Sequence, residues 1–214
     1  MNVFVLNTGR CGSTTFIQAC RHIKNYTSAH ESRSGLLGQA HFDYPENHIE
    51  ADNRLSWFLG RLDRRYGDEA FYVHLRRDDL ETARSFERRF GFRRGIIAAY
   101  RSNLHIGLDE STPPLEICLD YCDTVNSNIE LFLKDKTRKM EFRLERAADD
   151  FRRFWEQISA EGDLEAALRE FAIPHNASVL KAEVAKPPRS TLPIRAVQKC
   201  GRIVAKLPEF LKRA

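Results

Sequence analysis

The sequence of 214 residues has no long hydrophobic run, and this absence restricts what the protein can be. No apolar stretch approaches the roughly 20 residues that a membrane-spanning helix needs. The first ten residues, MNVFVLNTGR, contain neither a basic segment nor an apolar stretch of signal-peptide length. The sequence therefore predicts a protein that works in the cytoplasm, where it is made.

Cysteine is also scarce, and the spacing of the five cysteines excludes two kinds of site. They form no CxxC pair and no set with the spacing of metal ligands. Cys118 and Cys122 lie four residues apart, which places them on one face of a helix. An odd number of scattered cysteines is typical of buried thiols in a reducing compartment. We therefore expect neither a metal centre nor a redox motif.

The composition, with 42% apolar and 30% charged residues, is typical of a soluble globular protein long enough for one α/β domain. The net charge of +4 is unevenly distributed, because residues 176–214 contain nine Lys or Arg residues and only two Glu residues. The sequence predicts a domain over residues 1–175 and a basic tail over residues 176–214 that packs on the same domain.

The basic tail permits three interpretations. A helix near residues 194–211 has a basic and an apolar face, and it could lie on an anionic membrane surface, clamp a nucleotide or cover the edge of the domain. Nucleic acid is disfavoured as a partner, because the remaining chain is close to neutral and contains no recognised nucleic-acid-binding module.

Apolar runs typical of strands alternate with helical patterns along the first 175 residues. Strands are predicted at 2–7, 26–28, 71–75 and 139–144, and residues 31–53 are predicted to be a loop region. Helices are predicted from residue 13, after residue 52, from about residue 79 through 86, and over 93–104, 115–133, 149–158 and 164–171. This order predicts an α/β fold with a mainly parallel sheet and helices on both faces.

The strongest functional signal is the turn between the first strand and the first helix. Two glycines permit a tight turn, and the helix begins at a cluster of hydroxyl residues. Such a turn directs free backbone N–H groups and the positive end of a helix dipole at one point. It therefore predicts a phosphate-binding loop rather than an ordinary turn with a surface arginine. Its candidate binding residues are Arg10, Cys11, Gly12, Ser13, Thr14 and Thr15.

Two other phosphate loops fit this turn poorly. A kinase or NTPase loop, G-x-x-x-x-G-K-[ST], would need a lysine at Ser13 and a glycine at Asn7 if Gly12 were its second glycine. A tyrosine-phosphatase loop, Cys-x5-Arg, would need an arginine at Ile17. A P-loop kinase acting on a small molecule remains the alternative enzyme.

The turn resembles the loop R-x-G-[ST]-[ST] of many bacterial sulfotransferases that use 3′-phosphoadenosine 5′-phosphosulfate (PAPS). In that family the loop binds the 5′-phosphosulfate. A second family motif, an Arg followed eight positions later by a Ser after a later strand, binds the 3′-phosphate. Arg77 and Ser85 have this spacing after the predicted strand 71–75. Arg76 competes with Arg77, and the proline that often follows the family's Arg-Asp is missing.

This resemblance implies a P-loop-like sulfotransferase fold with PAPS as donor, 3′-phosphoadenosine 5′-phosphate (PAP) as product and no required metal. It implies that Arg10 stabilises the leaving group. The family also uses a general base after the second strand or a His somewhat later. This position gives Glu31 as first choice, with His30 and His41 as alternatives. The resemblance also implies that the predicted helix with Tyr121 corresponds to one that, in relatives, often approaches the nucleotide base.

The sequence thus predicts a small cytoplasmic sulfotransferase, free or peripheral to a membrane. Its acceptor would be a hydroxyl of a carbohydrate or a lipid-linked molecule. A protein that keeps the fold and binds a partner without catalysis is the non-enzyme alternative. Retention of Arg10, Arg77 and Ser85 argues against that alternative.

Overall fold

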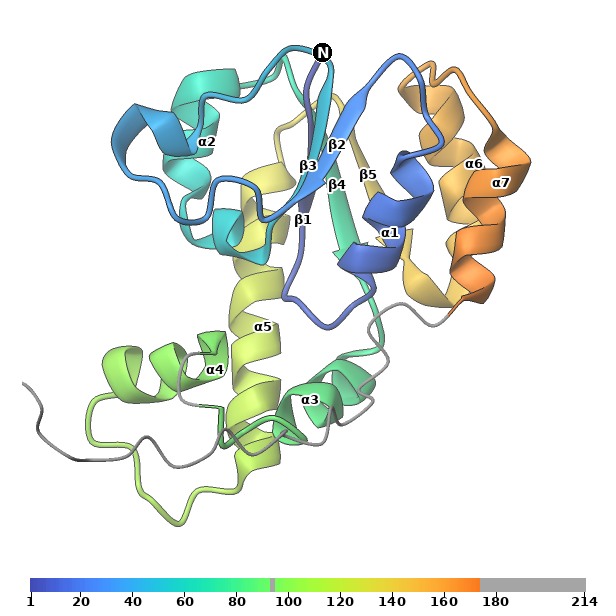
Figure 1. Cartoon of the computed structure of the whole chain (residues 1–214). Coiled ribbons are helices and arrows are strands. Elements are labelled where there is room, and N and C mark those ends of the chain that lie inside the picture. The colour runs from blue at the N-terminus through green and yellow to red at the C-terminus, as the bar shows by residue number, and fades with distance from the viewer. Residues whose placement is uncertain (93–94, 174–214) are drawn as a thin grey trace, which may run out of the picture. The chain divides into compact units, whose positions relative to one another are not determined.

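A single parallel sheet organises the computed structural model, which describes residues 1–92 and 95–173. Its five strands lie in the order β2-β3-β1-β4-β5, and every neighbouring pair is parallel (Figure 1). They are β1 (Val3–Leu6), β2 (Thr27–His30), β3 (His48–Ala51), β4 (Phe71–Arg76) and β5 (Lys139–Arg143).

Helices cover both faces of this sheet, as predicted. Helices α1, α6 and α7 pack on one face, while α2 and α5 pack on the other (Figure 1). Their bounds are α1 (Ser13–Cys20), α2 (Leu59–Tyr66), α3 (Asp79–Glu87), α4 (Ile96–Ala99), α5 (Pro114–Leu133), α6 (Ala147–Gln157) and α7 (Leu164–Arg169). The α/β fold class is confirmed. Over the described residues, no helix is both long and apolar enough to cross a bilayer.

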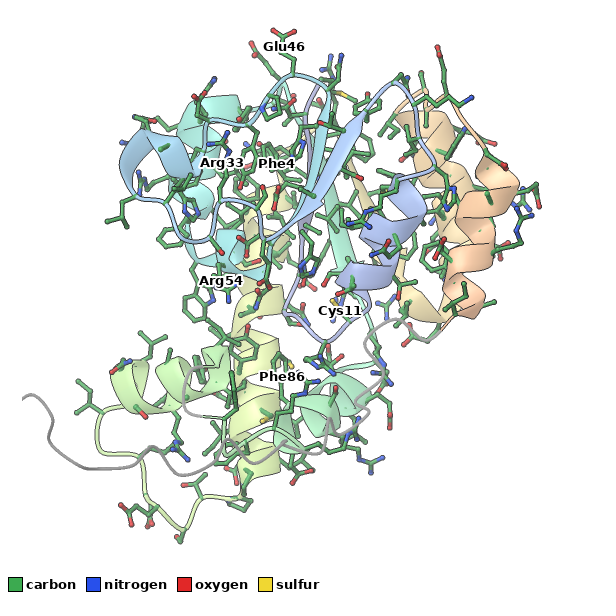
Figure 2. All side chains as sticks on the ribbon, viewed as in Figure 1. Phe4, Cys11, Arg33, Glu46, Arg54 and Phe86 are labelled. Carbon is green, nitrogen blue, oxygen red and sulfur yellow. The ribbon has the colours of Figure 1, made fainter. Side chains whose placement is uncertain are left out.

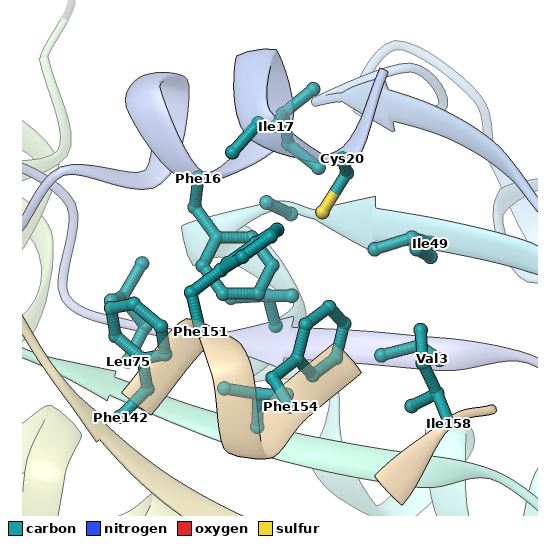
Figure 3. Packing of buried hydrophobic residues seen from close by; sticks show 14 of the residues in the cluster. Val3, Phe16, Ile17, Cys20, Ile49, Leu75, Phe142, Phe151, Phe154 and Ile158 are labelled. Carbon is teal, nitrogen blue, oxygen red and sulfur yellow. The ribbon is translucent and has the colours of Figure 1, made fainter. Parts of the chain in front are cut away.

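The side chains of β1 and β4 alternate between two cores, because successive residues of a strand point to opposite faces. On the α1 face, the ring of Phe16 contacts Phe142, Phe151 and Phe154 at centroid distances of 5.0–5.6 Å (Figure 3). On the other face, Phe4 of β1 packs among tyrosines. Strands buried on both faces give near-continuous apolar sequences, which explains why β1 and β4 are easy to predict.

The structure corrects the prediction for residues 31–53. This segment contains β3, which is fully buried and pairs with β1 on one side and β2 on the other. Two of its four residues are ionisable, His48 and Glu50, so it lacks an apolar pattern. The helix predicted after residue 52 is a 3-10 turn followed by α2, and the carboxylate of Asp52 accepts from the backbone N–H of Arg54 at 2.8 Å. Asp52 caps this 3-10 turn, Asn53–Trp57, which precedes α2.

The other predicted elements differ mainly at their ends. The predicted helix over 93–104 is the short α4 followed by a π-helical turn, Tyr100–Leu104, within the described part. Three further 3-10 turns occur at Gly38–His41, Leu144–Arg146 and Glu170–Ala172. The predicted domain boundary at residue 175 and the predicted basic helix near 194–211 lie outside the described residues.

Candidate active site

The two predicted phosphate motifs begin on neighbouring strands. Strands β1 and β4 are paired, with Leu6 opposite His74, so their carboxyl ends meet at one edge of the sheet. Open α/β sheets bind ligands at this edge. Figure 2 shows three labelled side chains near the carboxyl ends of the strands: Cys11 of the first loop, Arg54, and Phe86 of α3. Glu46 lies at the opposite end of the sheet.

Left-handed backbone conformations shape the loop after β1. Gly9, Arg10 and Gly12 have φ values of +84°, +62° and +92°. The Asn7 side chain braces this turn, since its Oδ1 accepts from the Gly9 N–H at 2.8 Å and its Nδ2 donates to the Val5 carbonyl at 2.9 Å. Gly12 caps α1 and has no side chain to accept from the first N–H groups of the helix. The start of a helix after such a loop is a common binding site for anions, because the helix dipole is positive there.

Gly12 is the position in this loop that tolerates a side chain least. A Cβ there would lie 2.7 Å from Leu144 Cδ1, and the positive φ favours glycine. We expect Gly12→Ala to lower the free energy of unfolding by about 2–4 kcal/mol, from backbone strain and overpacking. Thermal denaturation measures this loss. Gly35→Ala is the matched control, because a Cβ there meets no atom within 4 Å; equal losses in both variants would contradict this account.

A hydrogen bond joins the two predicted motifs. Arg10 Nε donates to Ser85 Oγ at 3.0 Å, so the first loop and α3 meet at one point. Burial and the charges of Arg89, Arg88 and Arg77 lower the pKa of Arg10. The guanidinium of Arg10 therefore lies within electrostatic range of three other cationic side chains. An anion placed among them would relieve the resulting repulsion.

Two of these arginines, Arg88 and Arg89, were not selected from the sequence. Both lie just after the end of α3 at Glu87, in a turn where the Arg89 N–H donates to the Phe86 carbonyl at 2.8 Å. In the sequence they look like the solvated end of a helix, so no local pattern singles them out. Between described residues, no ion pair links either arginine to a carboxylate.

The structure separates Arg76 from Arg77. Arg76 is mostly buried and pairs with Glu130 of α5 at 2.6 Å and with Asp79 at 3.2 Å. Arg77 lies close enough to Arg10 to lower its pKa, and it contacts Glu81 at 3.4 Å. The geometry favours Arg77 over Arg76 as a ligand of an anion beside Arg10.

Side chains of helix α5 and of the 3-10 turn Asn53–Trp57 form hydrogen bonds with the backbone at the start of the loop. Tyr121 is fully buried, and its hydroxyl donates to the Thr8 carbonyl at 2.7 Å. Asn53 Nδ2 reaches the same carbonyl at 3.4 Å, and Ser56 Oγ donates to the Asn7 carbonyl at 3.2 Å. The described contacts of Tyr121 are thus those of a support for the loop.

Cys11 lies in the loop but has the properties of a structural residue. Its thiol is fully buried, and burial raises its pKa to about 12. A thiol in this state is neutral at physiological pH and is a poor nucleophile. We expect Cys11→Ser, which keeps a donor toward Asn7 Oδ1, to bind PAP with an affinity within about threefold of wild type. Calorimetric titration measures this affinity, and loss of binding in a folded variant would contradict the structural role.

The three candidate bases have different surroundings. His30 ends β2, and its Nε2 lies 3.0 Å from Ser13 Oγ in the phosphate loop. Glu31, the next residue, pairs with Arg54 Nη1 at 2.9 Å. His41 is buried, with Nδ1 3.0 Å from the Leu36 carbonyl and its ring against Phe58. Of the three, His30 is the one whose described contacts reach the loop.

No protein-family model matches the sequence, and a search of curated proteins finds no match either. In its fold the chain is similar to the crystal structure of mouse sulfotransferase SULT7A1 complexed with PAP, with a TM-score of 0.52 and 10% sequence identity. The similarity covers 79% of this chain and 64% of the mouse sulfotransferase chain. This chain therefore spans less than two thirds of the length of the mouse protein. The fold is sulfotransferase-like. At this level of identity the likeness concerns the fold alone.

Within this sulfotransferase-like fold, most of the predicted site residues gather at one sheet edge. The loop residues, including Thr14 and Thr15 in the first turn of α1, lie beside Ser85 and His30. Glu31 follows His30 directly in the chain, whereas the described contacts of His41 are with Leu36, Phe42 and Phe58 instead of the loop. Among the described residues, no group of three or more His, Cys, Asp or Glu side chains could hold a metal ion.

Proposed function

We propose that this protein is a sulfotransferase that transfers the sulfuryl group of PAPS to an acceptor hydroxyl. The acceptor would be a carbohydrate or a lipid-linked molecule. The observation that carries the proposal is the hydrogen bond from Arg10 to Ser85. It joins two sequence motifs whose family counterparts bind the two ends of one nucleotide, the 5′-phosphosulfate and the 3′-phosphate.

The donor site follows from these positions. The N–H groups at the start of α1, with Ser13 and Thr14, would hold the 5′-phosphosulfate. Arg77 and Ser85 would hold the 3′-phosphate, and Arg89, in the turn after α3, would add a further cation near Arg10. Charge-assisted hydrogen bonds of this kind are about twice as strong as neutral ones. The three cationic side chains within electrostatic range of Arg10 support a ligand of high negative charge.

The proposed reaction needs no covalent bond between the substrate and the protein. The acceptor oxygen forms a bond to sulfur while the bond from sulfur to the 5′-phosphate oxygen of PAP breaks. Arg10 and the positive end of α1 stabilise the negative charge on the leaving phosphate. The acceptor proton passes to a general base, and contact with Ser13 favours His30 for this role. Glu31 remains the alternative base, because it is the residue next to His30. Its carboxylate forms an ion pair with Arg54.

The kinase alternative receives less support from the same geometry. A Walker lysine would stand at Ser13, whose hydroxyl instead contacts His30. In a protein that only binds a partner, the charged cluster around Arg10 would be a cost without a catalytic purpose.

A transfer assay tests the proposal. The full chain is incubated with PAPS carrying ³⁵S in its sulfuryl group, without added metal, and with a panel of oligosaccharide and glycolipid acceptors. Radioactive product in any acceptor, absent from a boiled control, supports sulfuryl transfer. Phosphate transfer from ATP with Mg²⁺, and none from PAPS, would instead favour the kinase. Binding of PAP with no transfer to water or to any acceptor would favour the non-catalytic alternative.

A further inference from the structure

A buried carboxyl group, that of Glu50 of β3, binds the turn after β2, where His30 ends the strand and Glu31 begins the turn. It is fully buried, and burial of an ionised carboxylate is costly unless hydrogen bonds compensate. Three donors compensate here. Glu50 Oε1 accepts from the Ser32 N–H at 2.8 Å, and Oε2 accepts from Ser32 Oγ at 2.6 Å and lies 3.0 Å from His48 Nε2.

The turn that Glu50 holds has an unfavourable backbone. Glu31 has a φ of +53°, in the left-handed region that residues other than glycine seldom adopt. The Glu31 N–H donates to the Ala51 carbonyl at 3.0 Å, and Ser32 is bound through both its backbone and its hydroxyl. The turn is therefore fixed on both sides of Glu31. Such strain persists only where surrounding contacts determine it, and it concentrates at functional sites.

A second layer fixes Glu50 itself. His48 Nδ1 lies 2.8 Å from Thr27 Oγ1, and the ring of Tyr44 stacks on the imidazole at 5.5 Å and 13°. This network of Thr27, His48, Glu50 and Ser32, here called the β2–β3 clamp, ties the start of β2 to the turn at its end. A packing role alone would not need a buried carboxyl group with three hydrogen-bond partners.

We propose that Glu50 is a positioning residue that fixes the turn after β2, so that His30 faces Ser13 and Glu31 faces Arg54. This proposal rests on the proposed function, in which one of these two residues takes the acceptor proton. Glu50 touches neither the phosphate loop nor Arg77 in the described contacts. Its loss should therefore disturb the base and spare donor binding.

The test uses the full chain and the variant Glu50→Gln, which keeps the shape but turns one acceptor into a donor facing Ser32 or His48. Turnover of PAPS with water as acceptor should fall about 10–100-fold, the usual effect of small misplacement, with KM for PAPS unchanged. The imidazole NMR signals of His30, assigned with His30→Asn, should shift in Glu50→Gln even without nucleotide. Glu165→Gln, an exposed carboxylate of α7, is the control and should behave as wild type.

Ser32→Ala is a second variant, for the case that Glu50→Gln does not fold. Ser32 is exposed, and removing its hydroxyl removes one of the three contacts of Glu50. This variant should shift the same His30 signals, by less. Wild-type His30 signals and wild-type turnover in Ser32→Ala and in folded Glu50→Gln would overturn the positioning role. Failure of the wild type to bind PAP would overturn the proposed function instead, and the His30 signals of the free protein would still test the clamp.

Discussion

Replacing His30 by Asn should lower the turnover of PAPS about 10²–10⁴-fold while leaving PAP affinity within about twofold of wild type. The imidazole contacts Ser13 in the predicted phosphate-binding loop, which under the proposed mechanism puts the base beside the transferred group. The Asn side chain retains a polar group but has no basic nitrogen. Steady-state turnover and calorimetric PAP affinity, measured on the same preparation, separate catalysis from binding.

Glu31→Gln is the companion variant, since the sequence alone ranks Glu31 first. Loss of its charge weakens the pair with Arg54, whose guanidinium also approaches Asp52. We expect a loss of turnover below about tenfold, because an ion pair with both side chains partly exposed to solvent contributes little. His41→Asn should keep the turnover of a folded enzyme. A large loss in Glu31→Gln, with His30→Asn active, would make Glu31 the base.

Removing Arg77 should discriminate between two nucleotides. Arg77→Ala should weaken PAP binding about 10–150-fold, because each charge-assisted hydrogen bond lost is worth roughly 1.5–3 kcal/mol. Binding of adenosine 5′-phosphosulfate, which lacks the 3′-phosphate, should change by less than about threefold. Competition binding with both nucleotides measures the difference.

Two arginine variants act as controls for this result. Arg10→Ala should weaken both nucleotides and also depress turnover, because Arg10 faces the leaving group in the proposed mechanism. Arg76→Ala should affect stability more than nucleotide binding, given its pairs with Asp79 and Glu130. Equal losses for both nucleotides in Arg77→Ala would remove Arg77 from the 3′-phosphate site.

The sequence predicts those parts of the site that depend on local chemistry. The glycines of the loop and the apolar run before it encode a strand, a tight turn and a helix start within 15 residues. Arg77 and Ser85 are recognisable because their spacing is fixed by one strand end and one helix. Their meeting with Arg10 depends on the pairing of β1 with β4. The order of parallel strands predicts a common edge but not which strands are neighbours.

What the sequence conceals depends on tertiary contacts. β3 was missed because Glu50 and His48 interrupt its apolar pattern, and their burial is compensated by partners from other segments. Arg89 has the sequence pattern of a solvated helix end. His30 and His41 have different surroundings because His30 packs against the start of α1, whereas His41 packs against Phe58. No local sequence pattern specifies these contacts.

Binding of PAP without metal is the most direct test of the account. A ligand that binds only the folded protein at a hundred times its Kd stabilises it by about 2.7 kcal/mol. For a chain of this size that corresponds to a rise in melting temperature of about 5–10 °C. The account predicts this rise with PAP in the presence of a chelator, and little or none with ATP under the same conditions. A rise with ATP that needs Mg²⁺, and none with PAP, would contradict it.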